Sequence, residues 1–376
     1  MTSPLITRHI RTACPWVACN IYISAGRPYY YPTLSQLLRE TIQHCRTIRS
    51  ESSSMIHKKQ EQSHSCTTES NIVLVHAYVD IPYNRSSFHF AGRGSAITQV
   101  VSTLAFQALD RLSPLIQQEH TQQEEEEEDN GKHESVSYTS STRHPLVGLV
   151  DHISILPLHS NISNTRYSNQ VMTEAKETAL SLANILEKRG VQVLKYGTAH
   201  PENVSLAMIR KTQTNFFQSG GEFVKTSSPT LPSSSSSSLW GLCTIGSPMN
   251  FVENVNIRLS SHCSQSMAQT LTRKLRSRNG GIPGVEALTL PYSGHRWEVA
   301  CNLLQPHLGS MRDIEELCKE WEMENQRGGD AWIESIYRVG TTEEQCLQTL
   351  MDSYDEDTLI QYESTIMNRF QSYAHS

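Results

Sequence analysis

The chain has 376 residues, a net charge of −6 and a sequence pI near 6.2. This length is enough for two ordinary domains with hydrophobic cores, which excludes a mini-fold held together by disulfides. The net negative charge does not suggest the basic surface by which proteins bind nucleic acid. No window approaches the roughly 18 uninterrupted apolar residues of a membrane-spanning helix, so the sequence predicts neither nucleic acid nor a membrane as a partner.

Cysteine usage bears on the compartment. None of the nine cysteines shares a CxxC spacing with another, so we expect neither a zinc ribbon nor a redox dithiol. An odd count without framework spacing is typical of a reducing compartment, and we expect a cytoplasmic or nuclear protein. The segment through Tyr31 carries arginines and no acid, as transit peptides do. Because residues 16–23 alternate like a strand that the fold needs, organelle import stays only the alternative.

Hydrophobic periodicity predicts strands alternating with helices in the first half of the chain. Residues 49–69 are polar and Ser-rich and are expected to form a loop. Residues 117–142 are acidic and nearly free of apolar side chains, so we expect them to be disordered. Strands are expected at 16–23, 72–79, 86–91, 146–158 and 191–196, and helices at 34–48, 97–112 and 171–186.

The composition changes at residues 218–238, where Gly, Pro and six consecutive serines predict a linker. Beyond it, strands are expected at 251–259, 285–290 and 297–304, and helices at 267–275 and 314–321. This order favours a mainly antiparallel sheet with helices on one face, the ferredoxin-like arrangement. The predicted domains are therefore 14–217, which includes the acidic insertion, and 239–325. An acidic tail follows at 326–376.

Sixteen histidines raise the question of a metal site. No HxxxH or HExxH motif occurs, and His144 and His152 would lie about 26 Å apart along one strand. We therefore predict no metal. In the run Arg143-His144-Pro145, an imidazole at the mouth of a strand can serve as a general base near neutral pH. Asp151 is expected on the opposite side, and by spacing alone a structural role for His144 is the stronger alternative.

The glycine-rich turn at 279–284 has two interpretations. Three glycines and a proline between a helix and a strand usually mark a tight connection, but they also let a flat ligand approach the backbone closely. Spacing alone does not separate the two.

Five segments, in this order along the chain, resemble the formiminotransferase domain of folate-dependent formimidoyltransferase–cyclodeaminases. They resemble still more the stand-alone plant and algal relatives that lack the cyclodeaminase part. Each motif alone is weak, whereas five in the correct order are specific. The segments are IVLVHAYVDIPYNRSSFHFAG, HPLVGLVD, VLKYGTAHP, TIGSPMNFVENVNIRLSS and NGGIPGVEALTLPYSGHRWEVACNLLQP.

The resemblance implies two ferredoxin-like-type α/β subdomains, hence an α+β fold, that enclose a folate groove. It implies a transferase of one-carbon metabolism, linked to histidine metabolism. A formimino group would pass from N-formiminoglutamate or a related donor to tetrahydrofolate as co-substrate, with His144 as general base and no metal. A monomer and a homodimer both stay open. The implied substrate-binding residues are Asp80, Asn84, Arg85, Gly148, Trp240, Gly241, Gly246, Asn256, Gly284, Val285, Glu286, Ala287 and Leu288.

The chain departs from the family at three places. Leu146 replaces an arginine, Gly246-Ser247-Pro248 replaces Gly-Ala-Arg, and Ser24-Ala25-Gly26 replaces Ser-Glu-Gly. A substrate that carries carboxylates needs cationic partners, and Arg85, Arg143 or Arg258 are the candidates. The alternatives are a non-catalytic folate-binding or scaffold protein that retains the fold, and an interaction protein acting through its acidic segments.

Overall fold

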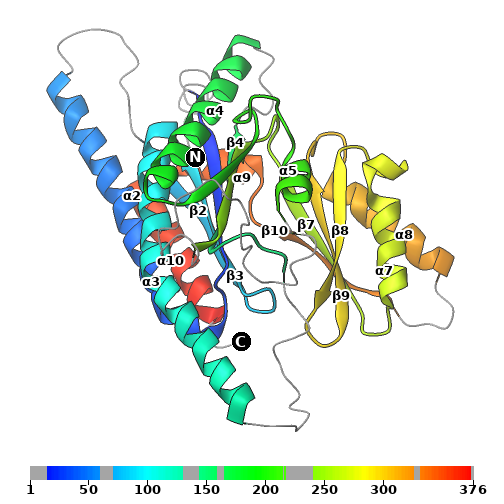
Figure 1. The fold of residues 1–376 in the computed structure, drawn as a ribbon. Helices are drawn as coiled ribbons and strands as arrows, with labels where there is room; N and C mark the ends of the chain where they lie inside the picture. The colour runs from blue at the N-terminus through cyan, green and yellow to red at the C-terminus, as the bar shows by residue number, and fades with distance from the viewer. Residues whose placement is uncertain are drawn as a thin grey trace. The chain divides into compact units, whose positions relative to one another are not determined.

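The computed structural model describes residues 15–59, 71–129, 144–158, 165–214, 216, 240–325 and 331–373. Contacts within the chain divide it into two compact units (Figure 1). The first unit comprises Met1–Ser137, Pro145–Met249 and Glu343–Ser376. The second comprises Tyr138–His144 and Asn250–Thr342.

The first unit contains a six-stranded sheet in the order β2-β3-β1-β4-β6-β5. Neighbours are antiparallel from β2 to β4, whereas β4, β6 and β5 run parallel. The strands are β1 (Val17–Ile23), β2 (Ile72–Asp80), β3 (Arg85–Gly92), β4 (Val150–Pro157), β5 (Gln192–Gly197) and β6 (Leu242–Ser247).

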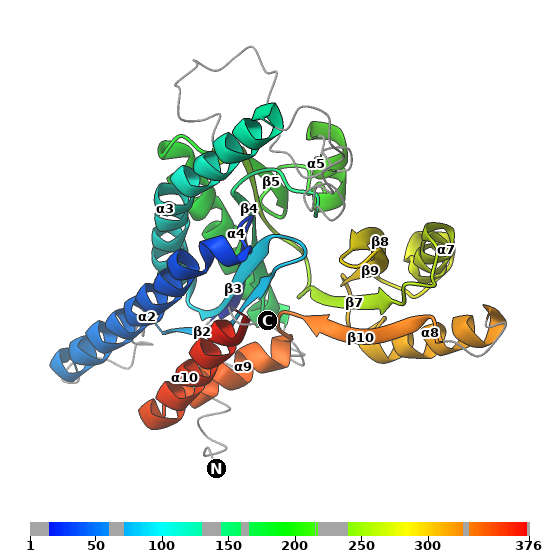
Figure 2. The ribbon, with the colours of Figure 1, turned by 90° about the horizontal axis from the view of Figure 1, so that it is seen from below.

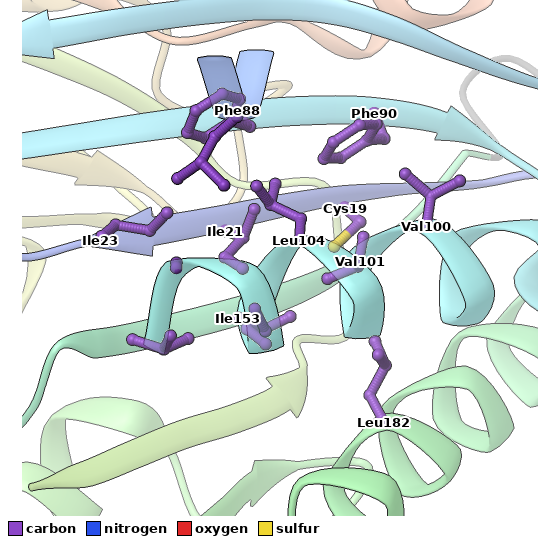
Figure 3. Close-up of a cluster of buried hydrophobic side chains, with 14 of the residues drawn as sticks. Cys19, Ile21, Ile23, Phe88, Phe90, Val100, Val101, Leu104, Ile153 and Leu182 are labelled. Carbon is purple, nitrogen blue, oxygen red and sulfur yellow. The ribbon is translucent and has the colours of Figure 1, made fainter. Parts of the chain in front are cut away.

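Side-chain alternation separates the two faces of this sheet, because successive residues of a strand point to opposite sides. Cys19, Ile21 and Ile23 of β1 are fully buried and belong to one apolar cluster with side chains of α3 and α4 (Figure 3). Helices therefore cover this face, and the intervening side chains of the strands face away from them. The helices are α2 (Tyr31–Lys59), α3 (Gly94–Asp129), α4 (Thr165–Lys188) and α5 (Leu206–Gln213), with a 3₁₀ turn η1 (Pro28–Tyr30).

The first four strands follow the ferredoxin-like plan. The chain runs β1-α2-β2-β3-α3-β4, and the two strands of each split βαβ unit are separated by one antiparallel strand. The segment α4-β5-α5-β6 extends this sheet by two parallel strands beyond β4.

The second unit repeats the same plan without an extension. Its sheet has the order β10-β7-β9-β8, antiparallel throughout. Its core contains Trp321 and alternate residues of β7 and β9. The expected fold class, two α+β subdomains, is thus confirmed. The elements are β7 (Glu253–Leu259), α7 (Gln265–Leu275), η2 (Ser277–Asn279), β8 (Val285–Tyr292), β9 (Arg296–Leu303), α8 (Met311–Asn325) and β10 (Ile333–Val339).

The C-terminal helices α9 (Glu343–Asp352) and α10 (Glu356–Ser372) pack beside β2 in the first unit (Figure 2). Phe370 is fully buried with its ring centroid 6.1 Å from that of Phe88. Glu363 of α10 is also buried, and its carboxylate accepts hydrogen bonds from Arg46 at 2.7 Å and Arg49 at 3.0 Å. These contacts make the end of the chain part of the first core.

Several expectations from the sequence were wrong. Helix α2 continues through Lys59, although residues 49–69 were expected to be a loop, and α3 continues to Asp129, into the segment expected to be disordered. Once a helix is nucleated and packed on the core, each further residue adds one main-chain hydrogen bond, so a polar segment can continue the helix. The rest of both segments, and the predicted linker at 218–238, lie outside the described residues.

The chain is also grouped differently from the predicted division. Strand β6, assigned to the range 239–325, pairs with β4 and β5 in the first sheet. The predicted tail supplies β10, which closes the second sheet, and α9 and α10, which join the first unit. Both errors have one cause, because the order of elements along the chain does not reveal which sheet a late strand joins or which unit a late helix packs against.

We expect Glu363→Gln to lower the free energy of unfolding by about 2–3 kcal/mol, because two arginines lose their shared buried carboxylate. Urea denaturation followed by circular dichroism measures this. Glu316→Gln is the matched control, since Glu316 forms an exposed i,i+4 pair with Arg312 and should change stability by less than about 0.5 kcal/mol. Equal effects of the two substitutions would show that α10 is not held by this carboxylate.

Candidate functional site

Three charged side chains of the first unit meet at the beginning of β4. The Asp151 carboxylate is fully buried, and its Oδ2 accepts hydrogen bonds from Arg85 at 2.8 Å and from Arg210 at 3.3 Å. Its Oδ1 accepts one from the main-chain N–H of Val147 at 2.8 Å. Arg85 is the first residue of β3, and Arg210 lies on α5. We call these three side chains the arginine–aspartate cluster.

A β-bulge places Asp151. In the pairing of β1 with β4, Tyr22 is opposite His152 whereas Ile23 is opposite Val150, so Asp151 is the extra residue. A bulge interrupts the alternation of a strand and redirects a side chain. This is why the simple alternation argument could not locate the Asp151 carboxylate.

Each guanidinium of the cluster lies over an aromatic ring. The Cζ of Arg85 is 4.3 Å from the ring centroid of Tyr22, and that of Arg210 is 4.1 Å from that of Phe216. Stacking of this kind fixes the plane of the guanidinium fork. Desolvation lowers the pKa of Arg210, but an arginine in a protein stays charged. The cluster therefore has two cations and one anion, a formal charge of +1.

A backbone crossing holds the segment that leads to Asp151. Gly148 and Gly241 form an isolated antiparallel bridge, and the N–H of Leu149 donates to the Trp240 carbonyl oxygen at 2.9 Å. A Cβ on Gly148 would lie 2.1 Å from the carbonyl oxygen of Leu242, so only glycine fits. Three predicted binding residues thus meet here, and close chain packing accounts for both glycines.

Asn84 binds the loop at residues 24–27. It adopts a left-handed conformation with φ 49°, which asparagine tolerates, and its Oδ1 accepts hydrogen bonds from the main-chain N–H groups of Gly26 and Arg27 at 2.7 and 3.0 Å. The Ser24 hydroxyl donates to the Gly148 carbonyl oxygen at 2.8 Å. The loop at 24–27 is therefore bound to both the Asn84 turn and the glycine crossing.

A continuous band of tyrosine and histidine rings crosses the face of the first sheet that points away from the helices. Neighbouring ring centroids along it are 5.4–6.0 Å apart. We call it the ring band; its members are His76, Tyr78, His89, Tyr22, His152 and Tyr196.

The histidines of the ring band are neutral. Burial lowers the pKa of His152 far below its ordinary value, and repulsion from Arg210 and Arg85 lowers it further. The Thr244 hydroxyl donates its proton to the main-chain carbonyl oxygen of Asp151 at 3.0 Å. The hydroxyl oxygen of Thr244 therefore accepts a hydrogen bond from Nδ1 of His152, which lies 3.0 Å away. The neutral ring then carries its proton on Nδ1. Burial also lowers the pKa of His89 strongly and that of His76 to about 4.

The predicted residues of the second unit form a separate group. The side-chain amide of Asn256 donates a hydrogen bond to the Glu298 carboxylate at 2.9 Å. Asn256 and Leu288 lie on the same face of the sheet, because each of them is paired with Ala300 of β9. Glu286 shares the face of Leu288 by alternation. Val285 and Ala287 instead pack in the core, and Gly284 makes the preceding turn with φ 72°.

Of the remaining predicted residues, Asp80 and Gly246 lie elsewhere in the first unit, whereas His144 is grouped with the second unit. Asp80 accepts a hydrogen bond from the Tyr83 N–H at 3.1 Å and so shapes the β2–β3 turn. Gly246 lies against Tyr196, whose carbonyl oxygen would be 2.3 Å from an added Cβ. His144 is half-buried, and the covalent chain keeps its Cα within about 10 Å of the Val147 nitrogen that binds Asp151.

Sequence reasoning missed Arg210, Phe216 and the ring band. Arg210 lies on a short helix that was not predicted, and nothing in its local pattern distinguishes it. The ring band did leave a signal in the sequence, namely polar or ring side chains that alternate with apolar ones. On β3, His89 lies between two buried phenylalanines. On β1, Asn20 and Tyr22 alternate with Cys19, Ile21 and Ile23.

Among the described residues, no group of three or more His, Cys, Asp or Glu side chains is arranged to hold a metal ion. None of the helices in that part of the chain has the length and hydropathy required to cross a membrane.

Comparisons with known proteins agree with the resemblance seen in the sequence. Residues 138–248 match the sequence model of the formiminotransferase domain, N-terminal subdomain. A protein of Arabidopsis thaliana named formiminotransferase cyclodeaminase-like protein is 30% identical over 173 residues, which cover 43% of this chain and 54% of that protein. The chain thus spans about half the length of this relative. The resemblance is confirmed, and the chain is formiminotransferase-like over the matched part.

A solved structure, the periplasmic protease PqqL from Escherichia coli, aligns with 95% of this chain and 42% of its own at 10% identity. Its TM-score of 0.18 is too low to carry an argument.

Asp151→Asn should lower the free energy of unfolding by about 3–5 kcal/mol, because it removes the buried carboxylate that Arg85 and Arg210 share. Chemical denaturation monitored by tryptophan fluorescence measures this change. The control is Asp110→Asn, since Asp110 forms an exposed pair with Arg189 and should contribute less than about 1 kcal/mol. If Asp151→Asn lowered the free energy of unfolding by less than about 1 kcal/mol, the central role of this carboxylate would be contradicted.

Protein stability should decrease as the pH falls below about 6.5, the ordinary pKa of histidine. The lowered pKa values of His76, His89 and His152 mean that the unfolded chain takes up protons first. The stabilisation from each such histidine is complete above pH 6.5 and is lost as the pH falls toward its folded pKa, with a slope of up to about 1.4 kcal/mol per pH unit in between. His152→Gln should reduce the slope between pH 6 and 5 by about one such contribution, whereas the exposed His262→Gln should leave it unchanged.

Proposed function

We propose that this protein transfers a formimino group from N-formiminoglutamate, or a closely related donor, to tetrahydrofolate, with His144 as the general base. The observation that carries the proposal is the family match over residues 138–248. It contains the motif from His144 to Asp151, and in the structure the last residue of this motif anchors the arginine–aspartate cluster.

The chemistry suits an imidazole at the position of His144. N5 of tetrahydrofolate attacks the formimino carbon, and the new C–N bond gives a tetrahedral intermediate. A base must then remove the proton from the attacking nitrogen and deliver it to the glutamate nitrogen as the old C–N bond breaks. A histidine with a pKa near neutrality can do both.

The ring band supports binding of a flat co-substrate by the first unit. Tyrosine and imidazole rings offer apolar faces and hydrogen-bonding edges together, which suits a pteridine. Because its histidines are neutral, they would accept as well as donate hydrogen bonds. In the second unit, Asn256, Glu286 and Leu288 share the sheet face opposite the helices, and these are three of the residues that the resemblance implies for folate binding.

A second candidate, a folate-binding or scaffold protein without turnover, is favoured by one observation. Leu146 and Pro248 stand where the family has arginines, so two cationic partners of an anionic substrate are replaced by uncharged residues. Folate affinity without transfer would identify this candidate.

The test is formimino transfer to tetrahydrofolate by the full chain. His144→Ala should reduce kcat by about 100-fold or more while the melting temperature and tetrahydrofolate affinity, measured by calorimetry, stay unchanged. His262→Ala is the control, because His262 is an exposed histidine of the second unit. Equal turnover in the His144 variant would refute the assigned base, and absence of both folate binding and turnover in the unmodified protein would refute the proposed function.

A further inference from the structure

The main chain that follows His144 is hydrogen-bonded to the beginning of β6. The carbonyl oxygen of Val147 accepts a hydrogen bond from the N–H of Leu242 at 2.8 Å, and the N–H of Leu149 donates one to the carbonyl oxygen of Trp240 at 2.9 Å. Both residues of this segment are fully buried. The segment at 147–149 is therefore fixed to one neighbouring element by two main-chain hydrogen bonds.

Ser24, which directly follows β1, binds the same segment with two further hydrogen bonds. Its main-chain N–H donates to the carbonyl oxygen of Leu149 at 2.8 Å, and its hydroxyl donates to the carbonyl oxygen of Gly148 at 2.8 Å. Ser24 is only 5% exposed, so water cannot readily take the place of the hydroxyl if it is removed. The segment at 147–149 is thus held by two elements that are far apart in the sequence.

The loop at 24–27 is itself fixed, so Ser24 has a firm support. The side-chain oxygen of Asn84 accepts hydrogen bonds from the N–H groups of Gly26 and Arg27. A Cβ on Gly26 would lie 2.4 Å from the main-chain nitrogen of Arg85, so the loop lies directly against the beginning of β3. Contacts on the main chain of the loop therefore determine where the Ser24 hydroxyl is placed.

Few free torsions separate this support from the imidazole of His144. Each residue has two soft backbone torsions, but Pro145 has a fixed φ and restricts His144 to an extended conformation. The freedom of His144 relative to Val147 thus resides mainly in Leu146 and in the ψ of Pro145. A shift of the main chain at 147–149 consequently moves His144, and a misplacement of about 1 Å can lower a catalysed rate by about 100-fold.

We infer that Ser24 is a positioning residue for His144, because its hydroxyl and N–H fix residues 148–149 and, through them, the imidazole that removes the proton during transfer. The inference rests on the proposed function for the role of His144 as base. Ser24 lies outside residues 138–248, which match the family model. The site therefore extends to the end of β1, and Ser24 acts through the main chain and not on the reacting atoms.

A purely structural role for the Ser24 hydroxyl gives a different expectation. If it only satisfies a buried carbonyl group, Ser24→Ala lowers stability and leaves turnover unchanged. Ser113 provides the matched control, because its hydroxyl is also buried and donates to a main-chain carbonyl oxygen, that of Leu109 in α3, at 2.6 Å. Ser113→Ala removes the same kind of hydrogen bond without altering the contacts of residues 147–149.

The first measurement is the rate of formimino transfer to tetrahydrofolate by the full chain. Ser24→Ala should lower kcat about tenfold or more and change the KM for tetrahydrofolate less than about twofold, whereas Ser113→Ala should change neither. In the His144→Ala background, Ser24→Ala should cause no further loss of the residual rate, because a residue that acts through His144 has no effect once the imidazole is gone.

The second measurement does not depend on turnover. Hydrogen–deuterium exchange of the full chain, read by mass spectrometry on the peptide that contains residues 145–150, should be about tenfold faster at the amides of Val147 and Leu149 in Ser24→Ala. In NMR spectra, the ring resonances of His144 are identified by their absence in His144→Ala, and they should shift in Ser24→Ala. Ser113→Ala should leave both the exchange and the resonances unchanged.

Unchanged exchange at residues 147–149, or unshifted His144 resonances, in Ser24→Ala would overturn the inference. So would an unchanged kcat in a protein that transfers the formimino group, or an equal loss of kcat with and without His144. The outcome is separable from that of the proposed function. If the unmodified protein transfers no formimino group, the proposed function fails, while faster exchange together with shifted His144 resonances still supports the positioning role of Ser24.

Discussion

The first unit depends on the neutralisation of buried arginines by Asp151. Two guanidiniums cannot lie in the interior of an α/β unit without a counter-charge, and Asp151 supplies it from a bulge rather than from a regular strand position. The nearby irregularities serve this placement. The glycine crossing fixes the approach to β4, and the N–H of Val147 binds the second carboxylate oxygen.

The two units share a strand order but differ in how each sheet closes its polar face. In the second unit Glu298 accepts hydrogen bonds from Tyr337 and Asn256 and pairs with Arg258, so its charges balance. In the first unit the extension α4-β5-α5-β6 adds two strands and brings a second arginine, Arg210, to the Asp151 carboxylate that also pairs with Arg85.

Much of the fold could be predicted from local patterns. The first strand and the two βαβ passages followed from period-2 and helical spacing, because those patterns depend only on which face is buried. The site was predictable only where the resemblance named residues such as Asn84, Arg85 and Gly148. Arg210 could not be found in this way, since its partner lies 59 residues away and the contact depends on a bulge and on the docking of a short helix.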